Sequence, residues 1–202
     1  MENIEFESYK RKNGHDEFLE FIEELPIKDQ QKLLEVIELT QEKGLLTAQK
    51  MKWIKKLDDN LFELRSKVSS NIQRVLYFHV VNGRYVITHG FTKKTQTTPK
   101  REIKHAKQIR RNGSMKINDL IKEKSKDPEF KKGLDTERGK LEAAIALYNA
   151  RTDAGLTQAE LSQLAGTSQK TIANIEHGEN VTFDKFFSIM NALGRKIEIK
   201  VI

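Results

Sequence analysis

Cysteine is absent from this 202-residue chain, and proline, tryptophan and long apolar runs are scarce. Without cysteine the chain has no disulfides, no thiolate metal ligands and no cysteine nucleophile, a composition typical of a reducing compartment. No apolar run approaches the roughly 20 residues that a membrane-spanning helix needs, and no apolar segment typical of a signal peptide opens the chain. We therefore expect a cytoplasmic protein that makes no contact with a membrane.

Positive charge is unevenly distributed along the sequence. The formal net charge is +7, and residues 1–112 hold 22 basic against 16 acidic residues. Residues 93–111 carry eight basic residues and a single acid, Glu102. A basic surface beside an acidic flank is typical of proteins that bind polyanions. On charge alone, a solvated lysine-rich face without a partner remains the alternative.

Hydrophobic periodicity in the first half predicts an α+β domain, with two N-terminal helices packed on an antiparallel sheet. "IEFESY" alternates as a strand does, and residues 17–25 and 27–43 have apolar residues at helical spacing. Three strands follow, in "LFELRSKV", "IQRVLYFHVV" and "RYVITHGFTK". Thr98 and Pro99 then offer an N-cap and a first-turn proline for a basic helix to about residue 111.

The strand register follows from the expected turns. The dipeptide "NG" at 82–83 predicts a two-residue hairpin turn, which sets Phe78 opposite Ile87 and Leu76 opposite His89 on the core face.

A three-residue loop at 69–71 would extend the same apolar face by pairing Leu64 with Leu76. In that register Arg65 and Arg74 point to opposite faces of the sheet. A bulge, a strong twist or a different loop would bring the two arginines together.

Three stretches of the first half carry a family resemblance: "LFELR", "RVLYF" and "HGFTKKTQTTPKREI". Together with the order of helices and strands, they resemble the HigB branch of the RelE superfamily, the toxins of bacterial toxin–antitoxin pairs, over nearly all of residues 1–111. The resemblance implies an endonuclease that cuts mRNA in the ribosomal A site without a metal or another cofactor. The implied catalytic residues are Arg65, Arg74, Lys93 and Lys94, and we assign RNA binding to Lys67 and Lys100.

Such a site is chemically reasonable because RNA carries its own nucleophile. The 2′-hydroxyl attacks the adjacent phosphate once it is aligned and the developing charge is stabilised. Arginine binds a phosphate in bidentate fashion, and a desolvated lysine can transfer a proton. Arg65 could instead form an ion pair near Glu63, which is the structural alternative.

The positions of the histidines predict no metal site and indicate no clear general acid. No two histidines stand at a metal-ligand spacing such as i, i+4. His89 lies on the predicted core face, where a hydrogen-bonded structural role competes with a role as general acid. The general acid therefore stays unassigned.

Helical patterns dominate the second half. A long amphipathic helix precedes a capping box formed by Thr157 and Glu160, which starts a short helix that ends near Gly166. Ser168 starts another helix, which ends near Gly178. Two short helices around a tight glycine turn predict a helix-turn-helix at about residues 156–178.

The stretch "TQAELSQLAGTSQKTIANIEHGE" resembles the DNA-binding domains of phage repressors and Xre-type antitoxins over its whole length. Helical spacing turns Ile172 and Ile175 inward and Lys170 and Asn174 outward. The resemblance implies that Gln158 contacts a DNA phosphate and that Gln169, Lys170, Thr171 and Asn174 enter the major groove. A helical scaffold that binds no DNA is the alternative, since residues 113–202 have a net charge of only +1.

Two further segments suggest contacts. "RKIEIKVI" at the C-terminus alternates as a short strand, which would pair with a second copy in a dimer or with a sheet edge. "MKINDLIKEKSKDPEFKKGLD" places Ile117, Leu120 and Ile121 at helical spacing, and we expect this segment to dock on the first half.

The two resemblances meet at "RRNGSMKIND", with Met115 where a second chain would start. We expect a toxin domain at 1–112, a linker at 113–114 that we interpret as engineered, and a HigA-like antitoxin at 115–202. The antitoxin half would neutralise the toxin half, bind operator DNA and form a dimer. The alternative is a single transcriptional regulator whose basic N-terminal module binds without catalysis.

Overall fold

The computed structural model describes residues 4–11, 13–80, 83–93, 97–109 and 114–198. Lys94, Gly113 and residues 199–202 lie outside the described residues, and so does Asn82 of the expected hairpin turn. The chain divides into two compact units, residues 1–136 and 137–202. Among the described residues, no helix is both long and apolar enough to cross a membrane.

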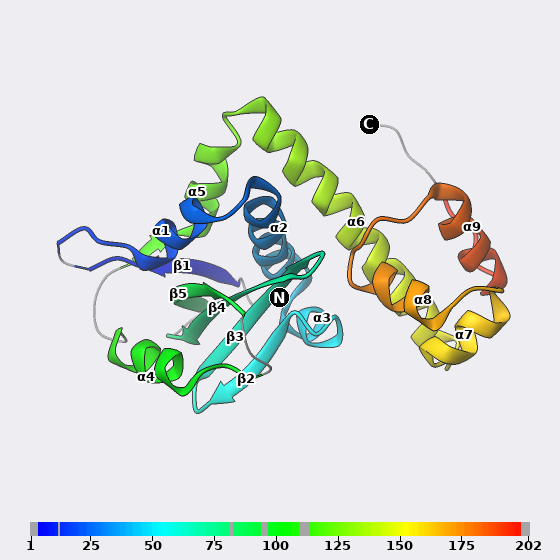
Figure 1. Ribbon diagram of the computed structural model, residues 1–202, viewed down its shortest axis with the longest axis horizontal. Coiled ribbons are helices and arrows are strands. Elements are labelled where there is room, and N and C mark those ends of the chain that lie inside the picture. The colour runs from blue at the N-terminus through cyan, green and yellow to red at the C-terminus, as the bar shows by residue number, and fades with distance from the viewer. Residues whose placement is uncertain (1–3, 12, 81–82, 94–96, 110–113, 199–202) are drawn as a thin grey trace. The chain divides into compact units, whose positions relative to one another are not determined.

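The first unit contains a six-stranded sheet and its covering helices (Figure 1). In chain order its elements are β1 (Glu5–Tyr9), α1 (Glu17–Glu24), α2 (Ile27–Lys43), α3 (Leu45–Lys50), β2 (Ile54–Asp58), β3 (Leu61–Val68), β4 (Asn71–His79), β5 (Arg84–Thr92), α4 (Lys100–Ile109), β6 (Ser114–Lys116) and α5 (Ile117–Lys124). Helix α6 (Pro128–Asp153) begins in this unit and ends in the second. The two expected N-terminal helices and the three expected strands are confirmed.

The sheet is mixed, so the prediction of an antiparallel sheet was wrong in one respect. Its strand order is β2-β3-β4-β5-β1-β6, and β1 runs parallel to β5 while the other neighbours are antiparallel. Hairpins impose antiparallel pairing only on strands that are neighbours in sequence, whereas β1 reaches β5 from far along the chain. Strands β2 and β6 were not expected, because one is short and lysine-rich and the other has three residues.

Helices α1 and α2 cover one face of the sheet and form the main core (Figure 1). Asp16 caps α1 by accepting hydrogen bonds from the backbone of Phe18 and Leu19, and Gly44 ends α2 with φ +86°. A buried hydrogen bond of 2.8 Å from Gln73 to Asp29 ties β4 to α2. The fully buried side chains of this core include Phe6, Phe18, Ile22, Leu33, Leu34, Ile37, Leu64, Tyr77 and Ile87.

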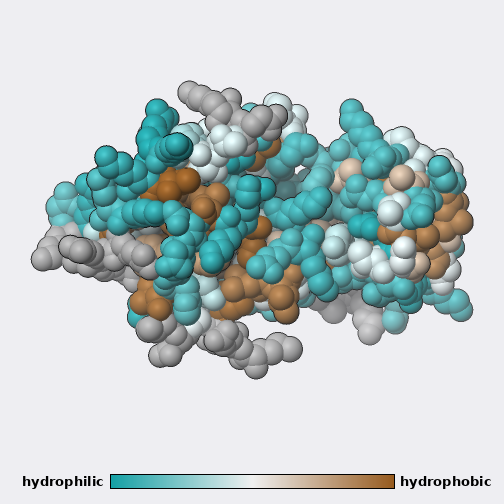
Figure 2. All heavy atoms as spheres, turned by 90° about the horizontal axis from the view of Figure 1, so that it is seen from below, coloured by the Kyte–Doolittle hydropathy of each residue, from teal (hydrophilic) through white to brown (hydrophobic). Residues whose placement is uncertain are grey.

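Helix α4 packs on the opposite face of the sheet. Ala106 lies in a cluster with Leu61 and Leu76, which buries the apolar side of the helix. Its outward side is basic, with exposed Lys100, Arg101, Lys104 and Lys107. Figure 2 looks from the side on which α4 lies, and hydrophilic side chains cover most of the visible surface.

The β3–β4 register differs from the predicted one. Val68 pairs with Asn71, so the turn contains two residues, and Ser69 adopts φ +54° within it. The shorter turn shifts the pairing by one residue, and Leu64 lies opposite Val75 rather than Leu76. Because a shift of one residue exchanges the faces, Arg65 comes to lie directly opposite Arg74.

The β4–β5 register is correct in one part and wrong in another. Leu76 pairs with His89 as predicted, but Phe78 pairs with Val86 rather than Ile87. An irregularity between Leu76 and Tyr77 separates the two registers, with Thr88 as the extra residue on β5. The Thr88 hydroxyl donates to the Leu76 carbonyl, 3.1 Å away.

Residues 114–136 belong to the first unit, as the helical spacing of Ile117, Leu120 and Ile121 predicted. Strand β6 pairs with β1, and Ile117 is fully buried. The Gln41 side chain donates to Asn118 over 2.7 Å, and the Gln31 side chain donates to the carbonyl of Phe130 over 3.3 Å. The described part of the segment therefore joins the edge of the sheet and the side of α2.

The second unit packs helices around a small core. Besides the end of α6 it contains α7 (Gln158–Leu164), α8 (Gln169–Glu176) and α9 (Phe183–Ala192). Its core consists of Leu147, Ala150, Leu161, Ile172, Ile175, Ile189 and Met190. The Thr157–Glu160 capping box is confirmed, and Ser168 caps α8.

The predicted C-terminal strand is wrong for residues 195–198, which form neither strand nor helix. Ile197 packs against the core of the second unit instead. An isolated strand needs a hydrogen-bonding neighbour, and the described part of this unit is helical. The rest of the predicted strand lies outside the described residues.

Candidate functional site

Two arginines meet on the α4 face of the sheet around one carboxylate. Arg65 on β3 lies opposite Arg74 on β4. Glu63, two residues before Arg65 on the same face, binds both guanidinium groups. One carboxylate oxygen accepts from Nε of Arg65, and the other accepts from Nη1 of Arg74 over 3.0 Å. Glu63 thus places one negative charge between two guanidinium groups that would otherwise repel each other across the strands.

Thr98 completes this cluster from the turn before α4. Its hydroxyl accepts from Nη1 of Arg74 over 2.7 Å and donates to Glu63. The Thr98 hydroxyl therefore binds a guanidinium and a carboxylate just before α4, and its role as the N-cap of that helix stays a prediction. We call Glu63, Arg65, Arg74 and Thr98 the arginine cluster.

Two lysines of the predicted site lie one step further along the sheet. Lys67 pairs with Ile72, and the backbone N–H of Lys93 donates to the carbonyl of Ile72 over 2.8 Å. The register thus brings Lys67 and Lys93 to the same end of the sheet as the arginines. Lys100 lies exposed in the first turn of α4.

Exposure separates the members of the arginine cluster. The side chain of Arg65 is 30% exposed, that of Arg74 is 5% exposed, and that of Glu63 is fully buried. Only Arg65 of these three offers much surface to a ligand. Both predicted arginines therefore come together, but in different environments.

Glu63 and Thr98 are absent from the predicted site residues. The signal for Glu63 was present, because a carboxylate two residues before Arg65 in a strand must share its face. Nothing in the sequence pattern linked Thr98 to β3, since the contact joins positions 35 residues apart.

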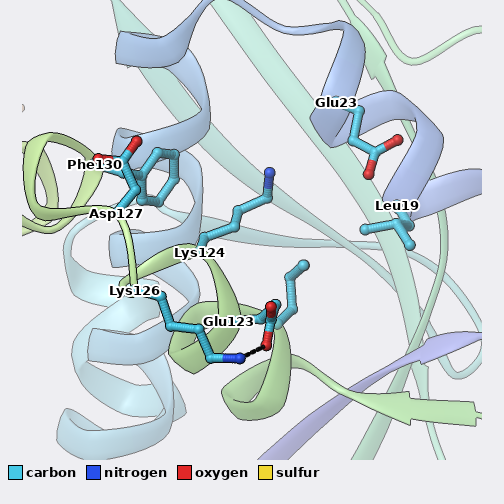
Figure 3. Close-up of a pocket in the computed structure, with 8 residues that line it drawn as sticks. Leu19, Glu23, Glu123, Lys124, Lys126, Asp127 and Phe130 are labelled. Atoms are coloured by element: carbon cyan, nitrogen blue, oxygen red, sulfur yellow. Dashed lines mark hydrogen bonds and ion pairs between the residues drawn. The ribbon is translucent and has the colours of Figure 1, made fainter.

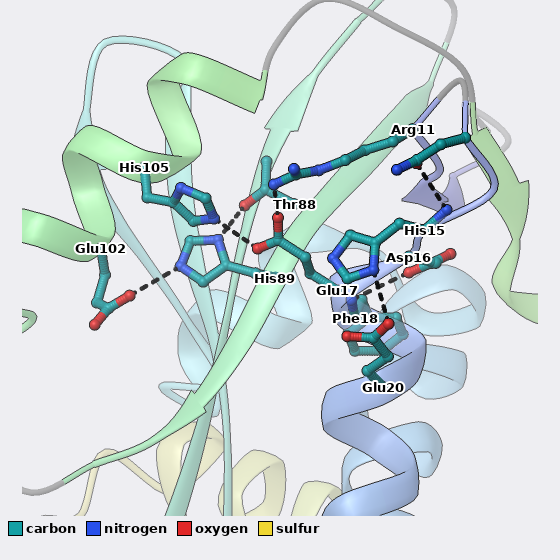
Figure 4. Close-up of polar contacts among 11 residues, drawn as sticks. Arg11, His15, Asp16, Glu17, Phe18, Glu20, Thr88, His89, Glu102 and His105 are labelled. Carbon is teal, nitrogen blue, oxygen red and sulfur yellow. Dashed lines mark hydrogen bonds and ion pairs between the residues drawn. The ribbon is translucent and has the colours of Figure 1, made fainter.

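A histidine pair connects β5, α4 and α1 (Figure 4). The rings of His89 and His105 are 4.8 Å apart, and His105 lies 2.6 Å from Glu17. His89 lies 3.0 Å from the hydroxyl of Thr88 and 3.3 Å from Glu102. Burial, and then the neighbouring His105, lower the pKa of His89. This environment fits a structural role for His89 better than a role as general acid.

The described residues hold no group of three histidine, cysteine, aspartate or glutamate side chains that could bind a metal ion. A separate hollow of about 740 Å³ opens between α1 and the segment that contains α5 (Figure 3). It is lined by Leu19, Glu23, Leu120, Glu123, Lys124, Lys126, Asp127 and Phe130. These residues include none of the arginine cluster.

Helices α7 and α8 form the expected helix-turn-helix in the second unit. Ile172 and Ile175 are buried as predicted, whereas Gln169 and Lys170 are exposed at the start of α8. Thr171 and Asn174 are half-buried on the same helix. The outward part of α8 therefore carries amide and ammonium groups that suit the edges of DNA bases.

A buried ion pair fixes the two helices against α6. Arg151 donates to both carboxylate oxygens of Glu176, over 2.6 and 3.1 Å. Gln158, the predicted phosphate contact, donates to Glu176 over 2.7 Å. A contact with a phosphate would use a hydrogen of the Gln158 NH₂ group. One of its two hydrogens is already donated to Glu176, and the other is left for a phosphate.

Comparison with protein families separates the same two regions. Residues 20–111 match the family described as phage-derived protein Gp49-like, a domain of unknown function (DUF891). Residues 147–200 match the helix-turn-helix family. No curated protein matches the chain. The chain thus combines a Gp49-like domain with a helix-turn-helix DNA-binding domain.

Proposed function

We propose that this chain is a toxin–antitoxin module with a HigB-like, RelE-type toxin at residues 1–112 and a HigA-like antitoxin at 115–202. The first part cleaves mRNA on the ribosome in the cytoplasm, and the second neutralises it and binds operator DNA to repress transcription. The observation that carries the proposal is the order of the two family matches, in which a Gp49-like region ends at residue 111 and a helix-turn-helix follows.

The proposed chemistry needs no metal. The RNA 2′-hydroxyl loses its proton and bonds to the neighbouring phosphorus, the bond from phosphorus to the 5′-oxygen breaks, and the leaving 5′-oxygen takes up a proton. The products are a 2′,3′-cyclic phosphate and a 5′-hydroxyl, and positive groups stabilise the charge that develops on the phosphate. Arg65 suits the phosphate, because a guanidinium donates two parallel hydrogen bonds. Lys67, Lys93, Lys94 and Lys100 supply further positive charge for the RNA backbone.

Expression in bacteria tests the enzyme directly. We expect residues 1–112 to arrest growth and to leave cuts in translated mRNA that primer extension maps, while the full chain does neither. Arg65→Ala in residues 1–112 should reduce cleavage by about 10²–10³-fold, the usual loss for one preorganised donor. If messages stay intact although the fragment is folded and soluble, the endonuclease proposal is wrong.

Contact between the toxin and antitoxin parts is supported by residues 114–136. They lie along β1 and α2, and their hydrogen bonds reach Gln30, Gln31 and Gln41 of α2. The arginine cluster lies on the other face, which α4 covers. We therefore propose that this segment neutralises the toxin without contacting Arg65 or Arg74.

A second candidate is a single transcriptional regulator with a non-catalytic basic module. The burial of Arg74 and Glu63 favours it, because a buried arginine–carboxylate pair is often purely structural. The same cleavage assay separates the two candidates, since a regulator leaves mRNA intact at every concentration.

A dimer formed through the second unit remains part of the proposal. Its support is an exposed aromatic pair, in which Phe183 is 71% exposed and its ring lies 6.2 Å from that of Phe187. Sedimentation should show a dimer for the full chain and a monomer for Phe183→Ser. A monomeric wild-type chain at micromolar concentration would rule this interface out.

The seam between the two parts is also a proposal. We propose that Gly113 and Ser114 form an engineered linker between proteins normally made separately. A natural coding sequence with a stop codon between Asn112 and Met115 would support it, and a continuous natural reading frame would exclude it.

A further inference from the structure

We propose that Glu63 is a positioning residue that aims Arg65 at an RNA phosphate, and that Arg74 acts through Glu63 rather than on RNA. This inference rests on the proposed function for its ligand. Its basis is the geometry of the arginine cluster, in which three charged side chains have different exposures.

Glu63 fixes the direction of Arg65. Its carboxylate binds Arg65 through Nε, the nitrogen nearest to the chain. Glu63 thus engages Arg65 at Nε, and the outer hydrogens of the two terminal NH₂ groups form a separate edge of the guanidinium. A phosphate takes two parallel hydrogen bonds, so the outer edge of the Arg65 fork is suited to bind it.

Arg74 is placed to hold Glu63. Nη1 of Arg74 donates to Glu63 over 3.0 Å and to Thr98 over 2.7 Å, and the Arg74 side chain is 5% exposed. A fully buried carboxylate requires compensating charge and hydrogen bonds, which Arg74 and Thr98 provide. Thr98 also anchors the start of α4, so the basic helix and Arg65 are fixed by one carboxylate.

Charge alone makes the opposite prediction for Glu63. A negative group beside a phosphate site repels RNA, so its removal should strengthen binding if Glu63 were a bystander. If Glu63 positions Arg65, its removal weakens binding, because the guanidinium loses its fixed direction and faces Arg74 without neutralisation. The sign of the change therefore distinguishes the two roles.

The test measures binding of the full chain to a fluorescent 2′-O-methyl RNA hexanucleotide of mixed sequence, which cannot be cleaved. We expect Arg65→Lys to weaken binding about tenfold, because an ammonium cannot replace a bidentate fork. Arg74→Lys should lose only about threefold, since a lysine still supplies a cation to Glu63. Glu63→Gln should weaken binding about fivefold, against the direction expected from charge.

Glu7→Gln is the matched control. Glu7 is also buried and pairs with an arginine of the neighbouring strand, Arg84, over 2.8 and 2.9 Å. It carries the same charge and lies outside the arginine cluster, so its loss should not weaken binding. Circular dichroism of each variant checks folding.

Each outcome is decisive. Stronger binding by Glu63→Gln, or equal losses in Arg65→Lys and Arg74→Lys, would overturn the positioning role. Lack of any effect in Arg65→Lys would overturn it as well. Failure of the proposed endonuclease appears separately, as intact mRNA in the cleavage assay while Arg65→Lys still weakens binding.

Discussion

Single charged residues inside the helix-turn-helix unit hold its helices together. Arg151 and Glu176 are both buried, and Gln158 and the carbonyl of Leu156 join the pair. Loss of one partner leaves the other charge buried without compensation. Residues that touch no DNA can therefore fix the angle at which α8 presents Gln169 and Lys170.

Arg151→Met should lower the free energy of unfolding of the second unit by about 3–5 kcal/mol. Arg195→Met is the control, since Arg195 pairs with Asp153 over 3.9 Å at the surface, where such pairs contribute at most about 1 kcal/mol. Calorimetry of the full chain measures both. Equal effects of the two variants would show that the buried pair has no special role.

His89 should make the stability of the first unit depend on pH. Burial lowers the pKa of His89 in the folded chain below its ordinary value, so the unfolded chain binds a proton first as pH falls. Stability is therefore full above about pH 6.5, the ordinary value, and is lost as pH falls towards the lower folded pKa. Beside His89 lie His105 and Glu102, which belong to α4, and Glu17 of α1.

Fluorescence of Trp53 measures this effect, because the chain's single tryptophan lies in the first unit and is 6% exposed. We expect His89→Gln to flatten the change in denaturation midpoint between about pH 7.5 and 5.5, relative to wild type. An unchanged slope in His89→Gln would assign the pH dependence to other groups.

Elements of the first unit approach each other closely where glycine permits it. A Cβ atom on Gly90 of β5 would lie 2.0 Å from the ring of Phe21 on α1. We expect Gly90→Ala to destabilise the unit by about 1–3 kcal/mol through overpacking. Gly139→Ala is the control, because open space surrounds that site on α6 and alanine favours helix by about 0.5–1 kcal/mol. Denaturation followed by Trp53 fluorescence and by circular dichroism distinguishes them.

The segment after residue 113 should stabilise the first unit as an integral element. Ile117 is fully buried there, so Ile117→Ala should cost about 2–4 kcal/mol of unfolding free energy measured through Trp53 fluorescence. Leu164→Ala is the control, because the Leu164 side chain lies in the second unit and is 56% exposed. This variant should leave the midpoint of the Trp53 transition unchanged. A Trp53 transition unaffected by Ile117→Ala would show that the segment folds separately.

Periodicity predicted the longer elements well and the pairing between them poorly. Helices α1, α2 and α4 to α8 appear where expected, because their signals are local, whereas the short α3 was not predicted. The contact between Arg65 and Arg74 depended on one residue of turn length at Ser69, which composition does not decide. The parallel β1 and the hydroxyl of Thr98 are long-range features, beyond any sequence window.

The whole molecule carries its excess charge in the first half, while the proposed DNA reader lies in the nearly neutral second half. Non-specific affinity for DNA should therefore come largely from the first half and fall steeply with salt.

Asn174→Ala should reduce the binding free energy by about 1–3 kcal/mol on operator DNA and by little on random DNA. Asn191→Ala, exposed on α9, is the control. A gel-shift titration at fixed salt measures both affinities. Equal losses on the two DNAs would show that Asn174 contacts the DNA backbone and not a base.

Strand β6 also determines what happens to the sheet when the two halves are made apart. β6 occupies the outer edge of β1, so a chain that stops at residue 112 exposes the unpaired N–H and C=O groups of "EFESY". An open strand edge is a template for pairing with other chains. Purified at high concentration, such a fragment should self-associate, whereas the small amounts needed in the expression test should stay soluble. In the full chain β6 therefore protects the edge of β1.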